Sequence, residues 1–217
     1  LADEGSFHEL YRNLTVDQLL EEENITDYYR DFLNRYEGRS HFKESLVVGR
    51  ARIHHFEVVM ALCEFYYCGG TMGVVFGEKF RRAVDYAILE NLPFISLCCS
   101  GGARLYEGIL ALMQMVKTVE SVNRLKRHGL PYISILADPS TGGAIASYAA
   151  LGDIIIAEPK ALFCFAGPRI VKQTMKKEIP EDFGLSERNM ANGQIDMITD
   201  RRKMRDTLSK ILRLFGE

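Results

Sequence analysis

Two glycine pairs, each placed directly after a short apolar run, constrain what this 217-residue chain can fold into. In the first copy, the run 94–99 stops at Gly101 and Gly102, and a helical pattern of apolar residues follows from about 106 to 128. A short apolar run bounded by turn residues is typical of a buried strand, and paired glycines permit a tight turn. The first copy therefore predicts a strand, a turn and the N-terminus of a helix.

The second copy repeats this order. The apolar run 132–136 precedes a turn over 138–144 that contains Gly142 and Gly143, and small side chains over 145–151 predict a further helix. A helix of small residues lets a neighbouring segment approach closely. Backbone N–H groups at a helix start point outward and carry the positive end of the helix dipole. Two such turns side by side predict an oxyanion hole.

An antiparallel pair of strands is predicted ahead of these two copies. Residues 46–53 and 56–62 have the pattern of strands, and His54 and His55 join them. Neighbouring residues of a strand point to opposite faces, so the two histidines are not expected to share a metal ion.

A glycine-rich stretch, 68–79, holds four glycines within nine positions and leads into a helix predicted over 80–91. Glycine allows positive φ and a close approach of the backbone to another group. The stretch either borders a ligand pocket or only lets the following helix pack tightly. It is not a Walker loop, because no Gly-Lys-Ser or Gly-Lys-Thr occurs in it.

The long helix predicted over 106–128 is amphipathic, and its apolar residues are expected to face the core. They are Ile109, Leu110, Met113, Val116, Val119, Val122 and Leu125. Met113 and Met115 are interpreted as core-filling side chains.

The rest of the chain continues a repeating order of strands and helices. Strands are predicted over 153–158, 161–165 and 195–199, and helices from Pro168, over 186–192 and over 201–214. In the last helix, Met204, Leu208, Ile211 and Leu212 form an apolar stripe for core packing or a partner. The order indicates an α/β fold built as a spiral of ββα units over 45–217. Residues 1–44, with short helices near 15–20 and 28–36, the second ending at Gly38, predict an N-terminal helical arm.

Composition excludes several classes of function. The 27 basic and 29 acidic residues give a net charge of −2, which provides no basic surface for nucleic acid. No apolar run approaches the ~20 residues needed to span a bilayer, and no secretory signal opens the sequence, so a cytoplasmic protein is expected. The five cysteines lie mostly in apolar runs without a Cys-x-x-Cys pair. They are expected to be reduced and to hold no metal.

Nucleophilic catalysis finds little support. Ser100 lies beside glycines, but the chain has no Gly-x-Ser-x-Gly and no histidine placed to act as its base. Cys98 and Cys99 lie at a strand end near a helix start, where a thiol pKa can be lowered, yet structural filler is the preferred interpretation. An oxyanion hole therefore remains as the expected chemistry.

A dozen short motifs along the chain resemble the carboxyltransferase β subunit of bacterial-type acetyl-CoA carboxylase, of the crotonase-like (ClpP/crotonase) superfamily. They are Ser100-Gly101-Gly102-Ala103-Arg104 with Glu107 and Gly108, Leu130-Pro131-Tyr132-Ile133-Ser134, Asp138-Pro139, Gly142-Gly143, Leu151-Gly152-Asp153, Ala157-Glu158-Pro159-Lys160-Ala161 and Phe165-Ala166-Gly167-Pro168-Arg169. The resemblance runs from about Leu46 to the C-terminus.

The resemblance implies a crotonase-like fold and a biotin-dependent acyl-CoA carboxyltransferase. Such a subunit transfers a carboxyl group from carboxybiotin, held on a separate biotin carboxyl carrier protein, to acetyl-CoA, giving malonyl-CoA for fatty acid biosynthesis within an ATP-using complex. It also implies an α-type carboxyltransferase partner, in an α2β2 assembly with the active site at the contact between the two. The substrate supplies the base in this chemistry, so backbone N–H groups are the main contribution of the protein.

The expected site residues come from the two turns and the segments beside them. Catalytic N–H groups are expected at Gly101, Gly102, Ala103, Gly142, Gly143 and Ala144. Substrate binding is expected at Gly70, Thr71, Met72, Gly73, Arg104, Leu105, Glu107, Gly167 and Arg169.

The chain departs from the family pattern in three ways. Leu105 and Tyr106 replace the usual Met-Gln, Cys98 and Cys99 replace small residues, and the N-terminal zinc ribbon of many β subunits is absent from this sequence. Two alternatives stay open. The first is a different enzyme: a biotin-independent decarboxylase of malonyl thioesters, carried by CoA or a carrier protein, or another crotonase-like enzyme. The second is an inactive scaffolding homologue.

Overall fold

The computed structural model describes residues 1–21, 25–37, 41–176 and 178–215. The predicted helix end at Gly38 lies outside the described residues. The strands are β1 (His8–Leu10), β2 (Leu46–Ile53), β3 (Phe56–Cys63), β4 (Phe94–Ser100), β5 (Tyr132–Thr141), β6 (Ile154–Ala157), β7 (Phe163–Cys164) and β8 (Met197–Ile198).

The α-helices are α1 (Asp27–Glu37), α2 (Val74–Glu90), α3 (Ile109–Arg127), α4 (Pro168–Met175), α5 (Ser186–Ala191) and α6 (Arg201–Phe215). Short 3-10 helices are η1 (Val16–Gln18), η3 (Cys68–Gly70), η4 (Leu105–Glu107) and η5 (Tyr148–Ala150).

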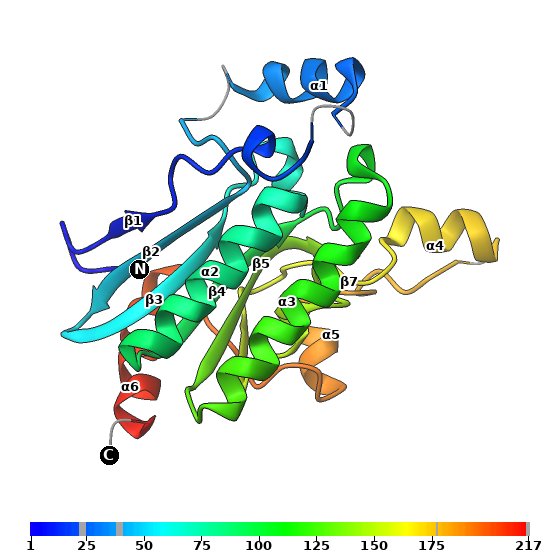
Figure 1. The fold of residues 1–217 in the computed structure, drawn as a ribbon. Helices are drawn as coiled ribbons and strands as arrows, with labels where there is room; N and C mark the ends of the chain where they lie inside the picture. Colours follow the sequence, from blue (N-terminus) through cyan, green and yellow to red (C-terminus); the bar gives the residue numbers. More distant parts are fainter. Residues whose placement is uncertain (22–24, 38–40, 177, 216–217) are drawn as a thin grey trace.

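One mixed sheet forms the centre of the molecule, with helices on both faces (Figure 1). The strand order is β1-β2-β3-β4-β5-β6-β8, and β7 pairs with β5 off this path. The β1, β2 and β3 pairings are antiparallel, and β3, β4, β5, β6 and β8 run parallel to one another. The fold is therefore α/β, with the carboxyl ends of β4 and β5 at the same edge of the sheet.

Two apolar clusters hold the layers together. On one face, α2 and α3 pack on the sheet through residues such as Phe80, Val84 and Val122. On the other face, α6 packs through Met204, Leu208, Ile211 and Leu212, all 5% exposed or less. The apolar stripe of the last helix is thus a core-packing face, one of its two predicted uses.

The hairpin of β2 and β3 is confirmed, with Ile53 paired to Phe56 across the turn. His54 and His55 form that turn with φ of 43° and 80°, so they are turn residues rather than strand residues. His54 Nε2 lies 2.8 Å from a carboxylate oxygen of Asp206 on α6. No group of His, Cys, Asp and Glu side chains suited to a metal ion occurs among the described residues.

The predicted helix over 145–151 is wrong. The structure has turns there and only the short 3-10 helix η5. Side chains take the carbonyl oxygens that a helix would use, because Ser147 donates to Gly143 O, Tyr132 to Tyr148 O and Ser134 to Ala149 O. These tertiary hydrogen bonds outweigh the local helical preference of small residues.

The turn predicted over 138–144 begins later than expected, because β5 continues to Thr141 through a cis Asp138–Pro139 peptide bond. Ser140 pairs with Phe163 of β7 and, on its other side, with Ser100 of β4. Pairing on both sides keeps this segment extended.

The predicted core face of α3 is wrong in its first half. Ile109, Met113 and Val116 are 68%, 52% and 61% exposed, whereas Val122 and Leu125 are fully buried. The first half of α3 instead packs on α2 through small and polar residues. A Cβ atom at Gly77 of α2 would lie 2.2 Å from Gln114 Oε1, so the two helices approach closely there and leave no room for larger side chains.

Candidate active site

The two glycine turns lie in direct contact. A Cβ atom built on Gly102 would lie 3.0 Å from the Gly143 nitrogen, and one built on Gly143 would lie 3.3 Å from the Ala103 nitrogen. Gly102 has φ of +103° and Gly142 has φ of +59°, a region that other residues rarely adopt. Glycine is therefore required for the two backbones to come this close.

Three of the six N–H groups expected to be catalytic are used inside the protein. Gly101 donates to Gly69 O at 3.0 Å and Gly102 to Ser100 Oγ at 3.0 Å. Gly142 donates to Phe165 O at 3.0 Å and to Cys164 O at 3.3 Å. These bonds hold the turns in shape and occupy the three amides within the protein, and a catalytic role for Gly101, Gly102 and Gly142 stays a prediction.

The N–H groups of Ala103, Gly143 and Ala144 donate no hydrogen bond within the described part of the chain. Of these, Ala103 and Gly143 lie on different turns and are neighbours, as the distances above show. Neighbouring backbone donors without a partner in the described residues suit the binding of an oxygen atom on which negative charge develops.

The first turn is fixed by the glycine-rich stretch before α2. Met72 donates its N–H to Gly102 O at 2.8 Å, and Arg104 donates its N–H to Met72 O at 2.9 Å. Ala103 is thus held between two backbone hydrogen bonds. Added Cβ atoms at Gly70 and Gly73 would lie 2.1 Å from Cys99 O and 2.2 Å from Glu107 Oε1. These glycines allow the stretch to pack against the turn, and whether Gly70, Thr71, Met72 and Gly73 also bind substrate stays a prediction.

Ser100 and the neighbouring cysteines are structural. Ser100 is fully buried, and its hydroxyl donates to Gly70 O at 2.7 Å. Hydrogen bonding with Cys63 and burial raise the pKa of Cys98, and burial raises the pKa of Cys99 to about 12. The thiols near the turn are therefore protonated at neutral pH, which agrees with their interpretation as filler.

Arg104 and Glu107 have fully buried side chains and form a cluster with Glu44 and Tyr29. Arg104 forms an ion pair with Glu44 and also donates to Ser45 Oγ at 2.8 Å. Direct contact of the two side chains with substrate stays a prediction.

The two carboxylates of this cluster have pKa values that shift in opposite directions. Burial acts to raise the pKa of Glu44, but the charge and hydrogen bonds of Arg104 hold it below its ordinary value. Burial raises the pKa of Glu107, and the nearby Arg104 and the hydrogen bond from Tyr29 offset this only in part. Sequence reasoning missed Tyr29, Glu44 and Ser45, because nothing near them in the chain indicates a buried charge network.

Leu105, Gly167 and Arg169 lie at the surface around the turns. Leu105 is 80% exposed and directly follows the first turn. Gly167 precedes α4, which projects from the body of the molecule (Figure 1). Arg169 is exposed and forms no ion pair within the described residues. The structure therefore does not bring Arg169 into the contact between the two turns.

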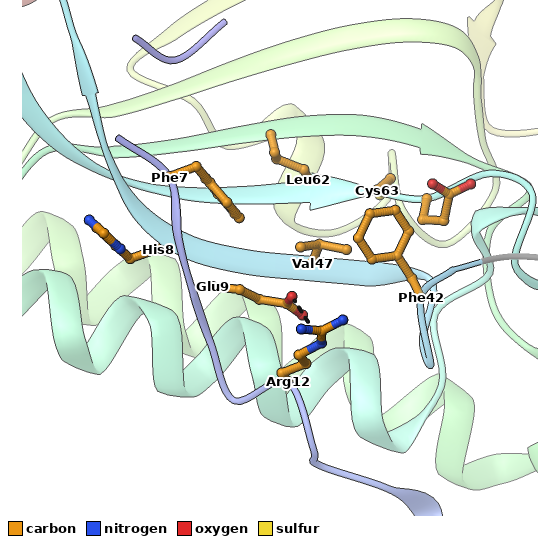
Figure 2. Close-up of a pocket in the computed structure, with 9 residues that line it drawn as sticks. Phe7, His8, Glu9, Arg12, Phe42, Val47, Leu62 and Cys63 are labelled. Atoms are coloured by element: carbon orange, nitrogen blue, oxygen red, sulfur yellow. Dashed lines mark ion pairs between the residues drawn. The ribbon is translucent and has the colours of Figure 1, made fainter. Parts of the chain in front are cut away.

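Two cavities differ in their relation to the turns. One of about 520 Å³ borders the second turn, with Ile145, Cys164 and Phe165 among its lining residues. Another, of about 730 Å³, lies against β2 and β3, and Figure 2 shows the Glu9–Arg12 ion pair at its rim. None of the expected site residues lines this second cavity, so it is separate from the candidate site.

The sequence matches the carboxyl transferase domain family over residues 15–215. It is 44% identical, over 188 residues, to the acetyl-coenzyme A carboxylase carboxyl transferase subunit beta of Sulfurihydrogenibium sp. (strain YO3AOP1), covering 87% of this chain and 67% of that protein. It is 46% identical to the subunit of the same name from Desulfitobacterium hafniense (strain Y51) over 217 residues, covering 100% of this chain and 70% of that protein.

Solved structures show the same fold. A transcarboxylase 12S structure with methylmalonyl-coenzyme A and methylmalonic acid bound has a TM-score of 0.78 and 28% identity, and the match covers 98% of this chain and 38% of that chain. A Pseudomonas malonate decarboxylase hetero-dimer has a TM-score of 0.73 and 24% identity, covering 100% of this chain and 82% of that chain. At 24% identity the second likeness concerns the fold alone.

Proposed function

This chain belongs to the carboxyl transferase domain family, and from that premise we propose that it is the β-type carboxyltransferase subunit of an acetyl-CoA carboxylase. The resemblance found in the sequence is confirmed, as is the crotonase-like fold. The proposed reaction transfers a carboxyl group from carboxybiotin on a carrier protein to acetyl-CoA, giving malonyl-CoA. The proposed setting is cytoplasmic fatty acid biosynthesis.

The observation that carries the proposal is the pair of unpartnered amides at Ala103 and Gly143. Removing a proton from the acetyl group of a thioester leaves an enolate, whose charge lies largely on the thioester oxygen. Two fixed N–H donors stabilise that oxygen without reorganising, and each contributes on the order of 3 kcal/mol to lowering the barrier. The donors present therefore fit an acyl-CoA thioester.

Carboxybiotin, brought by its carrier protein, supplies the carboxyl group and the base, so the chain needs no acid or base of its own at the turns. This agrees with the character of the neighbouring groups: Ser100 is buried and the Cys98 and Cys99 thiols are protonated. In this proposal the residues of the chain bind and orient the thioester, hold its oxygen and exclude water.

We also propose that an α-type carboxyltransferase subunit completes the site, in an α2β2 assembly. The supporting observation is an exposed apolar surface directly after the first turn, formed by Leu105, Ile109, Leu112, Met113 and Val116. Large exposed apolar side chains gathered beside a site are typical of a protein interface.

Among the described residues no helix is both long enough and apolar enough to cross a membrane.

The proposed division into an arm, 1–44, and a carboxyltransferase domain, 45–217, places the turns within the domain. In the arm, β1 extends the sheet beside β2, and α1 contacts the first turn region through Phe32 and Tyr106. The arm is thus proposed as a support for the domain rather than as a separate unit.

Reconstitution tests the proposed function. The purified chain, an α-type carboxyltransferase subunit and a carboxylated biotin carrier protein are assayed singly and together for malonyl-CoA formation from acetyl-CoA. The full mixture is expected to form malonyl-CoA, and the chain alone is expected to show negligible transfer. Turnover of a malonyl thioester without the biotin carrier would support the decarboxylase alternative instead. A partner-bound chain without any turnover would support the scaffolding alternative.

A further inference from the structure

The arm helix α1 is connected to the first glycine turn through one buried hydroxyl group. Tyr29 of α1 is 2% exposed, and its hydroxyl donates a hydrogen bond to Glu107 Oε1. The Tyr29 hydroxyl oxygen in turn accepts a hydrogen bond from Arg104 Nη1 at 3.3 Å. Three positions further along α1, the ring of Phe32 stacks on Tyr106 with 3.8 Å between ring centroids. The arm therefore contacts Arg104, Tyr106 and Glu107 in the loop that follows Ala103.

Arg104 and Glu107 also form hydrogen bonds with the backbone of the segment that supports the first turn. Glu107 Oε2 accepts the N–H of Val74 at 2.6 Å, at the first residue of α2. Arg104 Nη2 donates to Thr71 O at 2.9 Å, next to Met72, whose backbone brackets Ala103. Both side chains thus tie the loop 104–107 to the glycine-rich stretch on which the turn rests.

We propose that Tyr29 is a positioning residue for the oxyanion hole, which fixes the direction of the Ala103 N–H through Arg104 and Glu107. This inference rests on the proposed function of the two turns. Tyr29 does not touch the substrate in this proposal, and it acts only through the cluster.

The cluster has little capacity to compensate for a lost hydroxyl. Without it, Glu107 Oε1 would keep one partner, Arg104 at 3.4 Å, in a site closed to water. An inadequately paired buried carboxylate is costly, so Glu107 and Arg104 would shift to improve their contacts. Both lie in the short loop that begins at Ala103. A shift of a fraction of an ångström is felt in the transition state more than in substrate binding.

Protonation of Glu107 provides a second readout. The groups that face it are Arg104 in its own loop, Tyr29 on α1, Glu44 before β2 and Cys68 in η3. The Tyr29 hydrogen bond lowers the pKa of Glu107, so its removal raises that pKa further. A protonated Glu107 pairs less well with Arg104 and Val74. When the pH is lowered, the activity of a variant without this hydrogen bond should therefore begin to fall at a higher pH than that of the wild type.

The test compares Tyr29→Phe with Tyr66→Phe in the reconstituted complex. Tyr66 lies between β3 and η3, its side chain is 79% exposed, and it is outside the buried cluster. For Tyr29→Phe, kcat is expected to fall about tenfold with KM within about twofold, and the acid limb of the pH profile should move to higher pH. For Tyr66→Phe, kcat, KM and the pH profile should all match the wild type. An unchanged kcat and pH profile in a folded Tyr29→Phe protein would overturn the proposal.

Two further measurements keep the inference separate from the proposed function and from misfolding. Amide hydrogen exchange of the peptide 100–108 in the chain alone should speed up in Tyr29→Phe and not in Tyr66→Phe, whether or not the complex turns over. Equal exchange in both would contradict the coupling even if no activity is found. If Tyr29→Phe fails to fold, Glu107→Gln is the second test. The acid limb of its pH profile of activity should flatten, because Gln cannot be protonated in this range. An unchanged acid limb would exclude Glu107 as its origin and contradict the proposal.

Discussion

At the scale of single residues, Gly102 and Gly143 differ in what a side chain would do to them. Gly102 has φ of +103°, so any side chain strains its backbone as well as crowding Gly143. Gly143 lacks a positive φ, and an added Cβ atom would lie 3.2 Å from Met115 Sδ, 3.3 Å from Ala103 N and 3.5 Å from Ala103 Cβ. Met115 has a flexible side chain that can move, whereas the Ala103 amide is held by its neighbours. Gly143 is therefore the cleaner position for testing the oxyanion hole.

Gly143→Ala is predicted to lower kcat by about 100-fold, because the methyl group covers the Ala103 N–H and removes a donor from the transition state. The thermal midpoint and partner binding should stay near the wild type. Ala146→Ser, which adds one atom to an exposed residue of the same turn, is the control and should leave kcat unchanged. A folded Gly143→Ala protein with normal kcat would return the second turn to a purely structural role.

At the scale of elements, α2 and α3 are joined by a charged network centred on Glu78. Its carboxylate accepts hydrogen bonds from Arg81 at 2.7 Å and Arg82 at 2.8 Å, both on α2, and lies 3.4 Å from Lys117 on α3. The hydrogen bonds from Arg81, with further help from Arg82 and Lys117, outweigh burial and hold the pKa of Glu78 at about 2. The ionised form is thus favoured in the folded state, so this group contributes stability above its ordinary pKa of 4.5.

Glu78→Gln is expected to lower the free energy of unfolding by about 1–2 kcal/mol at pH 7, because solvent partly screens the exposed arginine partners and limits what the charge contributes. The difference from wild type should shrink as pH falls from about 4.5 towards 2, where the wild-type carboxylate is also protonated. Glu120→Gln on α3 is the matched control, since Glu120 forms an ion pair with Arg127 and both side chains are more than half exposed. Denaturant unfolding at several pH values measures both. A pH-independent difference would show that Glu78 acts through packing and not through charge.

At the scale of the whole molecule, the apolar surface beside the first turn points to the partner subunit. Val116 is 61% exposed in the first half of α3, within that surface. Val116→Glu is expected to weaken binding of an α-type subunit about tenfold or more, because it places a charge in an apolar contact. The isolated chain should keep its thermal midpoint, since Val116 makes little contact with the core.

Leu89→Glu is the control for this prediction. Leu89 lies near the end of α2, is 79% exposed and is outside the surface that follows the first turn. Leu89→Glu introduces the same charge at this position, and the variant should bind the α-type subunit as tightly as the wild type does. Calorimetric titration measures both affinities. Equal weakening by the two substitutions would mean that net charge, and not the position on α3, controls the association.

The sequence predicted much of this protein because many of its elements depend on local patterns. Strands β2 to β5, the hairpin, the existence of α3, the amphipathic helix α6 and the glycine pairs after β4 and β5 follow from apolar periodicity and turn residues. The family followed from motifs in a fixed order. Each of these features is determined by residues close together in the chain.

Only the tertiary structure decided the features that depend on distant partners. Helix α2 starts at Val74, six residues before the predicted start, where Glu107 accepts its first N–H. Residues 145–151 are not an α-helix, because Tyr132 and Ser134 take carbonyl oxygens there. Hydrogen bonds to distant segments also decide which backbone N–H groups of the two glycine turns have a partner. Arg104 is buried because Glu44 and Tyr29, both distant in the sequence, lie against it. Local pattern cannot encode these choices, because each depends on which donor or charge the fold brings to that place.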